Sequence, residues 1–155
     1  MAMHTWFECK IRYEKVMENG MQKKVTEPYL VDALSFTEAE ARIIEEMTPF
    51  ISGEFTVSDI KRANYSELFP SDEESADRWF KCKLIFITLD EKSGAEKKTS
   101  TQVLVQAADL RDAVKKLDEG MKGTMADYQI GMVSETPLMD VYPYSAGPND
   151  KPEFD

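Results

Sequence analysis

Hydrophobic and charged residues alternate at the start of the chain, as they do in a β-strand with one buried face. The alternation predicts a strand over residues 6–16 and a partner strand from about residue 24 to 33. Asn19-Gly20 lies between them and favours a tight hairpin. One face of the first strand carries Phe7, Cys9, Ile11 and Tyr13, and the other carries Trp6, Glu8, Lys10 and Arg12.

After the hairpin the apolar residues change from a two-residue period to a helical one. Ser35 and Glu38 match a capping box, which marks the start of a helix. Pro49 ends this predicted helix, and an extended segment over residues 54–63 follows, with a short final strand before Pro70. The residues at helical spacing are Phe36, Ala39, Ile43 and Met47.

The same series of features returns 73 or 74 residues later, which indicates an internal repeat. The chain has only two tryptophans and two cysteines. They share one offset, because Trp6 and Cys9 recur as Trp79 and Cys82. The turn, the helix cap, the apolar helix positions and the closing proline also recur, at Ser93-Gly94, Asp109 with Asp112, Leu110, Ala113, Leu117, Met121 and Pro143.

The repeat predicts an α+β fold of two tandem strand–strand–helix–strand repeats related by a pseudo-twofold. Each repeat is expected to be an antiparallel sheet covered by one helix, with a β-bulge at the equivalent positions Ser58 and Gly131. One repeat alone is small for a stable core, so we expect the two to pack as one body. The predicted boundaries are repeat 1 at 3–70, an acidic linker at 71–78, repeat 2 at 79–143 and a disordered tail at 144–155.

The formal net charge is −10, and half of it lies outside the repeats, with −3 in the linker and −2 in the tail. An acidic field disfavours tight nonspecific binding to nucleic acid, since basic side chains must displace the counterions of phosphate. No apolar run approaches the roughly 20 residues of a membrane-spanning helix, and the N-terminus lacks the pattern of a secretory signal. We therefore expect a cytoplasmic protein without a membrane partner.

No group of residues matches a catalytic or cofactor-binding motif. Cys9 and Cys82 fall on the apolar face of equivalent strands, where a thiol is expected to be buried and unreactive. His4 is the only histidine, so a Cys/His zinc site within one chain is excluded. No glycine-rich phosphate-binding loop is present. We therefore predict no catalytic residue, no metal site, no cofactor and no enzymatic activity.

The outer faces of the two first strands are the candidate binding surface. Aromatic rings between cationic side chains suit stacked bases or anionic ligands. The simpler interpretation is that each indole packs while each lysine lays its aliphatic stem across it, and we favour this interpretation. The residues of the candidate surface are Trp6, Lys10, Arg12, Trp79, Lys81 and Lys83.

Three segments of the chain resemble a known family. They are Met3–Lys10, Phe36–Glu40 and Ile60–Glu67, and they are similar to the bacterial and bacteriophage family catalogued as domain of unknown function 4494. The resemblance covers residues 3 to about 143. It implies a cytoplasmic protein of bacteria or their phages and brings no catalytic residue, cofactor or partner.

These observations favour a non-enzymatic binding module that engages a protein or nucleoprotein partner. The first alternative is binding of single-stranded nucleic acid or a nucleotide through the paired Trp/Lys strand face. The second alternative is a hydrolase with a site assembled from scattered residues, which requires a pocket with a strongly perturbed carboxylate.

Overall fold

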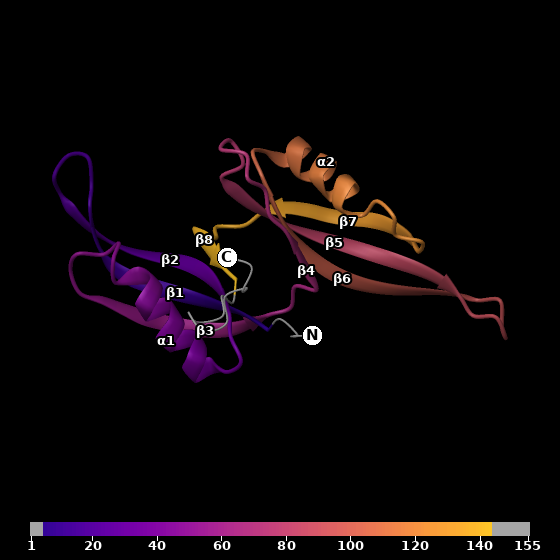
Figure 1. Ribbon diagram of the computed structural model, residues 1–155, viewed down its shortest axis with the longest axis horizontal. Helices are drawn as coiled ribbons and strands as arrows, with labels where there is room; N and C mark the ends of the chain where they lie inside the picture. The colour runs from indigo at the N-terminus through magenta and orange to yellow at the C-terminus, as the bar shows by residue number, and fades with distance from the viewer. Residues whose placement is uncertain (1–4, 144–155) are drawn as a thin grey trace, which may run out of the picture. The chain divides into compact units, whose positions relative to one another are not determined.

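The computed structural model describes residues 5–143, and they confirm the predicted α+β class. The element order is strand–strand–helix–strand–strand, and it occurs twice along the chain (Figure 1). No helix in this range is long and apolar enough to cross a membrane. The elements are β1 (Trp6–Val16), β2 (Gln22–Asp32), α1 (Phe36–Met47), β3 (Phe55–Ala63), β4 (Glu67–Phe69), β5 (Arg78–Leu89), β6 (Glu96–Ala107), α2 (Leu110–Gly120), β7 (Asp127–Glu135) and β8 (Asp140–Tyr142).

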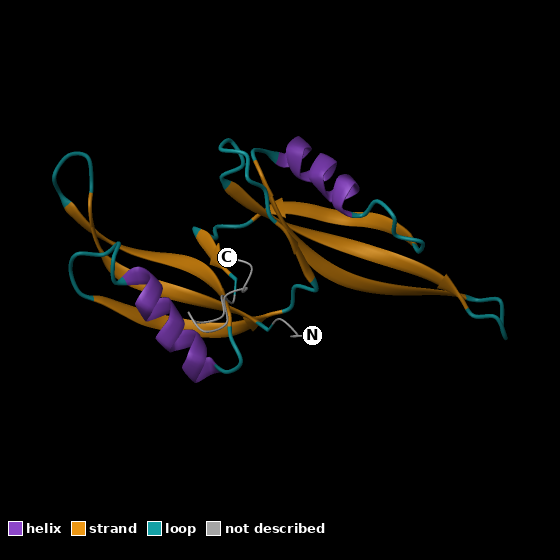
Figure 2. Cartoon of the chain, in the orientation of Figure 1, coloured by secondary structure: helices purple, strands orange, loops and turns teal. Residues whose placement is uncertain are grey.

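The described residues form two compact units. Unit 1 holds residues 5–63 together with 138–143, and unit 2 holds residues 64–137. The strand order is β3-β1-β2-β8 in unit 1 and β4-β6-β5-β7 in unit 2. Within each unit the three long strands pair antiparallel, and one helix packs against one face of their sheet (Figure 2).

The two short strands are exchanged between the repeats. β4 follows β3 in the chain, yet it pairs in parallel with β6 of unit 2. β8 follows β7 and pairs in parallel with β2 of unit 1. Each unit therefore consists of one repeat's long strands and helix, completed by the closing strand of the other repeat. The pseudo-twofold and the packing of the repeats as one body stay predictions.

The core of each unit lies between its sheet and its helix. Alternate residues of the first two strands face the helix and are fully buried, as the alternation in the sequence predicts. The buried residues of unit 1 are Phe7, Cys9, Ile11, Val31, Ala33, Ala39, Ile43 and Met47. Those of unit 2 are Phe80, Cys82, Leu84, Val103, Val105, Ala107, Ala113 and Leu117.

The predicted helix caps are confirmed in both repeats. The N–H of Glu38 donates to Ser35 Oγ at 3.1 Å, and Glu38 Oε1 accepts from the N–H of Leu34 at 2.7 Å. The cap of α2 has the same reciprocal form, because the N–H of Asp112 donates to Asp109 Oδ1 at 2.8 Å and Asp112 Oδ2 accepts from the N–H of Ala108 at 2.9 Å. These bonds satisfy N–H groups that the first turn of a helix leaves unpaired.

The predicted bulges and hairpins are also present. The pairing of β1 with β3 shifts by one residue at Ser58, and that of β5 with β7 shifts at Gly131. The hairpin turns are longer than the two-residue form, since the register closes at Val16–Gln22 in unit 1. Gly20 and Gly94 each adopt a positive φ within these turns, +83° and +71°, which glycine tolerates without a steric cost.

Candidate interaction surfaces

The two tryptophans of the candidate surface are buried. Trp6 is 4% exposed and Trp79 is 5% exposed, although both lie on the sheet face opposite the helix. Base stacking requires an accessible ring face. The burial of both indoles supports the packing interpretation, and the structure leaves only the cationic members of the candidate surface in contact with solvent.

In unit 1 the charged residues of the outer sheet face lie opposite partners of the other sign. Lys10 of β1 is paired with Asp59 of β3, and Glu14 is paired with Lys24 of β2. Opposite charges at directly paired positions attract each other and lower the net potential of the face. Arg12 is exposed and has Thr26 and Thr56 as its direct partners. Lys61 of β3 is likewise paired with Glu8, so three of the four cations on this face lie opposite a carboxylate and only Arg12 does not.

In unit 2 the corresponding lysines lie opposite neutral residues. Lys81 is paired with Leu104 and Ser134, and Lys83 is paired with Gln102 and Met132. Lys98 of β6 is on the same face, because it is paired with Ile87 of β5. None of these three lysines has an ion pair among the described residues. We call Lys81, Lys83 and Lys98 the lysine face.

Apolar side chains lie between the lysines of this face. Ile85 and Ile87 occupy alternate positions of β5 beyond Lys83 and are partly exposed. Met132 of β7 is 41% exposed and lies opposite Lys83. Apolar groups bordered by polar ones are the arrangement found in protein interfaces, where an apolar centre is surrounded by a polar rim.

The candidate surface predicted from the sequence did not include Lys98. The prediction considered only the first strand of each repeat, and Lys98 lies on the second. The sequence feature that could have pointed to Lys98 is the Lys97-Lys98 pair, which is equivalent in the repeat to Lys23-Lys24. Its side-chain direction follows only from the strand register, which pairs it with Ile87.

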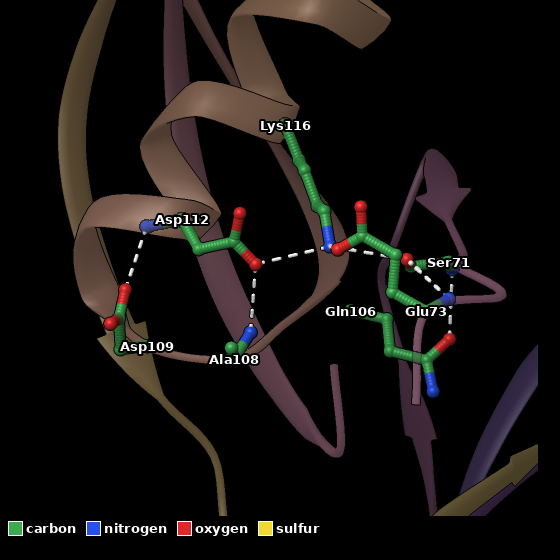
Figure 3. Close-up of polar contacts among 7 residues, drawn as sticks. All are labelled: Ser71, Glu73, Gln106, Ala108, Asp109, Asp112 and Lys116. Atoms are coloured by element: carbon green, nitrogen blue, oxygen red, sulfur yellow. Dashed lines mark hydrogen bonds and ion pairs between the residues drawn. The ribbon is translucent and has the colours of Figure 1, made fainter. Parts of the chain in front are cut away.

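A second polar cluster joins α2 to the segment after β4 (Figure 3). Lys116 Nζ lies 2.8 Å from Glu73 Oε1, 3.0 Å from Asp112 Oδ2 and 3.1 Å from Ser71 Oγ. The N–H of Ser71 donates to Gln106 Oε1 at 2.9 Å. The cluster fixes the acidic segment that leads from β4 to β5 against the helix and against β6.

The protonation of this cluster indicates a structural role. Hydrogen bonds from the N–H of Ala108 and from Lys116 hold the pKa of Asp112 below its usual range. Partial burial alone lowers the pKa of Lys116, but its bonds to Glu73 and Asp112 outweigh that effect and raise the pKa. Both groups therefore stay charged near neutral pH, whereas a general acid or base needs a pKa near the working pH. A hollow of about 420 Å³ lies beside the cluster, and Ser71, Glu73 and Lys116 form part of its lining.

Unit 1 contains a tyrosine cluster without a counterpart in unit 2. Glu27 Oε1 accepts hydrogen bonds from Tyr13 at 2.8 Å and from Tyr29 at 3.3 Å. Tyr142 of β8 stacks on Tyr29 with ring centroids 6.1 Å apart. Burial, followed by the hydrogen bond to Glu27, raises the pKa of Tyr13 to about 12. The cluster ties the closing strand β8 to the sheet through side-chain contacts.

The cysteines occupy the cores as predicted, and both are free thiols. Burial raises the pKa of Cys9 to about 12 and that of Cys82 to about 11. Among residues 5–143, no three side chains of the His, Cys, Asp or Glu type come together as metal ligands. His4 and the predicted disordered tail lie outside the described residues.

The sequence model of a family described as Domain of unknown function (DUF4494) matches residues 5–144. The match includes both repeats and the segment between them. No curated protein and no solved structure is matched by the chain.

Proposed function

The chain belongs to the DUF4494 family, and we propose that it is a non-enzymatic binding module that engages an acidic surface of a protein partner. The observation that carries this proposal is the lysine face of unit 2. Three lysines without ion pairs lie there in a protein whose net charge is −10, around partly exposed Ile85 and Ile87. The same proposal places the protein in the cytoplasm of a bacterium or in a phage-infected cell.

Charge balance within each unit supports the choice of this face. The outer face of unit 1 neutralises its own cations across strands, as Lys10 with Asp59 illustrates. None of the three lysines has a carboxylate directly opposite it, although Asp127 opposite Ile87 and Glu96 opposite Leu89 lie on the same sheet face. An external carboxylate therefore gains attraction at these lysines without displacing a directly paired group. An interface of this kind raises association rates at low salt and weakens as ionic strength rises.

Nucleic-acid binding by base stacking needs an accessible aromatic ring, which neither tryptophan offers in this structure. Trp6 and Trp79 are buried, so stacking on either indole requires the ring to leave its packed position. The net charge also opposes a polyanion. An acidic protein surface needs only the lysines and the apolar groups between them.

The test compares charge reversal on the two units. The triple variant Lys81→Glu, Lys83→Glu, Lys98→Glu removes the lysine face, and Lys10→Glu, Lys24→Glu, Lys61→Glu is its matched control on unit 1. Poly-L-glutamate is titrated into ¹⁵N-labelled protein, and we expect shifts of the amide signals of unit 2 that only the first variant abolishes. Equal shifts at both faces contradict the proposal. Turnover in a broad hydrolase substrate screen contradicts its non-enzymatic part, and shifts with oligo-dT but none with polyglutamate favour the nucleic-acid alternative.

A further inference from the structure

The second strand of unit 2 has an edge that the fold only partly covers. β6 has twelve residues, and β4 pairs with only three of them, Val103 to Val105. The preceding residues, Glu96 to Ser100, are exposed and pair on one side only, with β5. We call this stretch the open edge of β6. An edge of this kind presents unpaired N–H and C=O groups that another strand can meet.

The hydrogen bonds at the covered end show which groups point outward. The C=O of Gln102 accepts from the backbone N–H of Ser66 at 2.8 Å, on the side away from β5. Successive residues of a strand direct their backbone groups alternately to the two neighbouring positions. The N–H and C=O groups of Lys98 and Ser100 therefore point to the same side as those of Gln102, where the described residues offer them no partner strand.

Charge identifies the chemistry of a strand that fits beside this edge. The side chain of Lys98 belongs to the lysine face, and that of Lys97 lies on the opposite face of the sheet, since successive side chains alternate. Both are exposed and without an ion pair among the described residues. A strand with carboxylates beside Lys97 and Lys98 thus finds a cation on each face of the sheet, while Glu96 at the start of the edge repels it. We propose that the open edge of β6 binds an extended acidic segment of the partner polypeptide as an added strand.

This inference rests on the proposed function and adds the mode of binding to it. Strand addition obtains affinity from main-chain hydrogen bonds and specificity from alternate side chains. The same side of β6 already pairs with a strand, because β4 lies parallel to its C-terminal half. An added strand continues the position of β4 and brings its acidic side chains next to Lys97 and Lys98.

The equivalent edge of unit 1 differs in charge. β2 has eleven residues, of which only three are paired with β8, and Lys23-Lys24 is at the position where β6 has Lys97-Lys98. There Glu14 is paired with Lys24, and Lys15 lies 3.6 Å from Glu27 Oε2. Glu14 opposite Lys24 reduces the attraction that this lysine offers to an acidic strand, whereas Lys98 lies opposite the neutral Ile87. The β2 edge is therefore the matched control within the same chain.

Edge lysines also occur in proteins as a protection against edge-to-edge aggregation. The two roles predict different results for a proline substitution at an outward-pointing residue. Ser100→Pro removes one outward N–H and leaves the groups that pair with β5 in place, and Thr26→Pro does the same at the equivalent position of β2. Circular dichroism and thermal unfolding of each variant check that the fold is retained.

The probe is a synthetic peptide of alternating glutamate and threonine, compared with its lysine and threonine counterpart. We expect the acidic peptide to slow hydrogen exchange at the amides of Lys98 and Ser100, and Ser100→Pro to weaken binding by about tenfold or more while Thr26→Pro leaves it unchanged. Suppose the peptide shifts the signals of Lys81 and Lys83, but Ser100→Pro still binds it and no amide is protected from exchange. That result overturns strand addition and leaves the proposed function intact.

If neither the peptide nor polyglutamate shifts any signal of unit 2, both proposals are wrong. An equal loss of peptide affinity in Ser100→Pro and Thr26→Pro overturns the assignment to β6. If Lys97→Gln, Lys98→Gln causes only aggregation and leaves peptide affinity unchanged, the lysines are protective and the inference is wrong.

Discussion

Arg42 and Lys116 stand at equivalent positions of the two repeats, and each reaches from its helix to the chain that follows an exchanged strand. Arg42 donates to the C=O of Asp32 and, at 3.1 Å, to the C=O of Pro143 after β8. Lys116 donates to Ser71 and Glu73 after β4. One basic residue per helix thus fastens a closing strand that originates in the other repeat.

Replacing Lys116 by methionine is expected to lower the free energy of unfolding by about 1 kcal/mol, since the side chain keeps its apolar stem but loses its polar contacts. The estimate is small because Glu73 is largely exposed, with 60% of its side chain accessible. Urea unfolding of Lys116→Met and of Lys115→Met, an exposed neighbour, measures the difference. Equal midpoints for the two variants would show that the cluster does not hold the segment.

Gly120→Ala is expected to destabilise unit 2, although alanine favours helices. A Cβ at Gly120 meets the ring of Phe69 at 2.9 Å, so this ring must shift. Overpacking of this kind costs about 1–3 kcal/mol, more than the roughly 1 kcal/mol that alanine contributes to a helix. Thermal unfolding measures the effect, and Phe69→Leu in the same chain should recover part of it. A rise in stability for Gly120→Ala alone contradicts the packing.

The two helix caps should contribute similar stability. Ser35→Ala and Asp109→Ala each remove the acceptor of one N–H in the first turn, at a cost of about 1 kcal/mol. Ser35→Asp should keep the cap, because a carboxylate accepts the same bond and suits the helix N-terminus. Chemical denaturation compares the three variants. If Ser35→Asp lowers the free energy of unfolding as much as Ser35→Ala does, Ser35 stabilises the protein by some contact other than the cap.

Both thiols are expected to resist alkylation while the protein is folded. Burial raises the pKa of Cys9 to about 12 and that of Cys82 to about 11, so the reactive thiolate is scarce near pH 8. Mass spectrometry after iodoacetamide treatment should show labelling in urea and almost none in buffer. Rapid labelling of either cysteine in buffer is incompatible with the core position of that thiol.

Alkaline pH should destabilise unit 1 through its tyrosines. The pKa of Tyr13 and that of Tyr142 are each raised to about 12 in the folded chain, chiefly by burial. An unfolded tyrosine ionises near 10, so above that pH the unfolded chain binds fewer protons and the free energy of unfolding falls until about pH 12. Below pH 10 this contribution is fully present. Urea midpoints between pH 9 and 11.5 should fall less steeply in Tyr13→Phe, and an unchanged slope contradicts the assignment.

The helices and long strands could be predicted from the sequence alone, because each depends on residues close together in the chain. The alternation from Trp6 to Val16 matches the bounds of β1, and the apolar spacing behind Ser35 matches those of α1. The bulge at Gly131 follows from comparison with Ser58. The charge balance of the two outer faces was not accessible in this way, since it depends on which residues the register places opposite Lys10 and Lys83.

The pairing of the two closing strands, β4 and β8, could not be predicted from local sequence and is seen only in the folded chain. Both have the same apolar pattern, so local sequence does not distinguish a strand that returns to its own sheet from one that joins the other. To pair with β2 in its own sheet, β4 would have to cross three strand spacings from β3, about 14 Å. It would also have to start opposite Tyr29, three residues along β2 from Asp32, which is level with Ala63 at the end of β3. That is a straight-line distance of about 17 Å, whereas the chain from Ala63 to Glu67 spans only about 14 Å when fully extended. The connection is too short to return, and β4 therefore completes the sheet of unit 2.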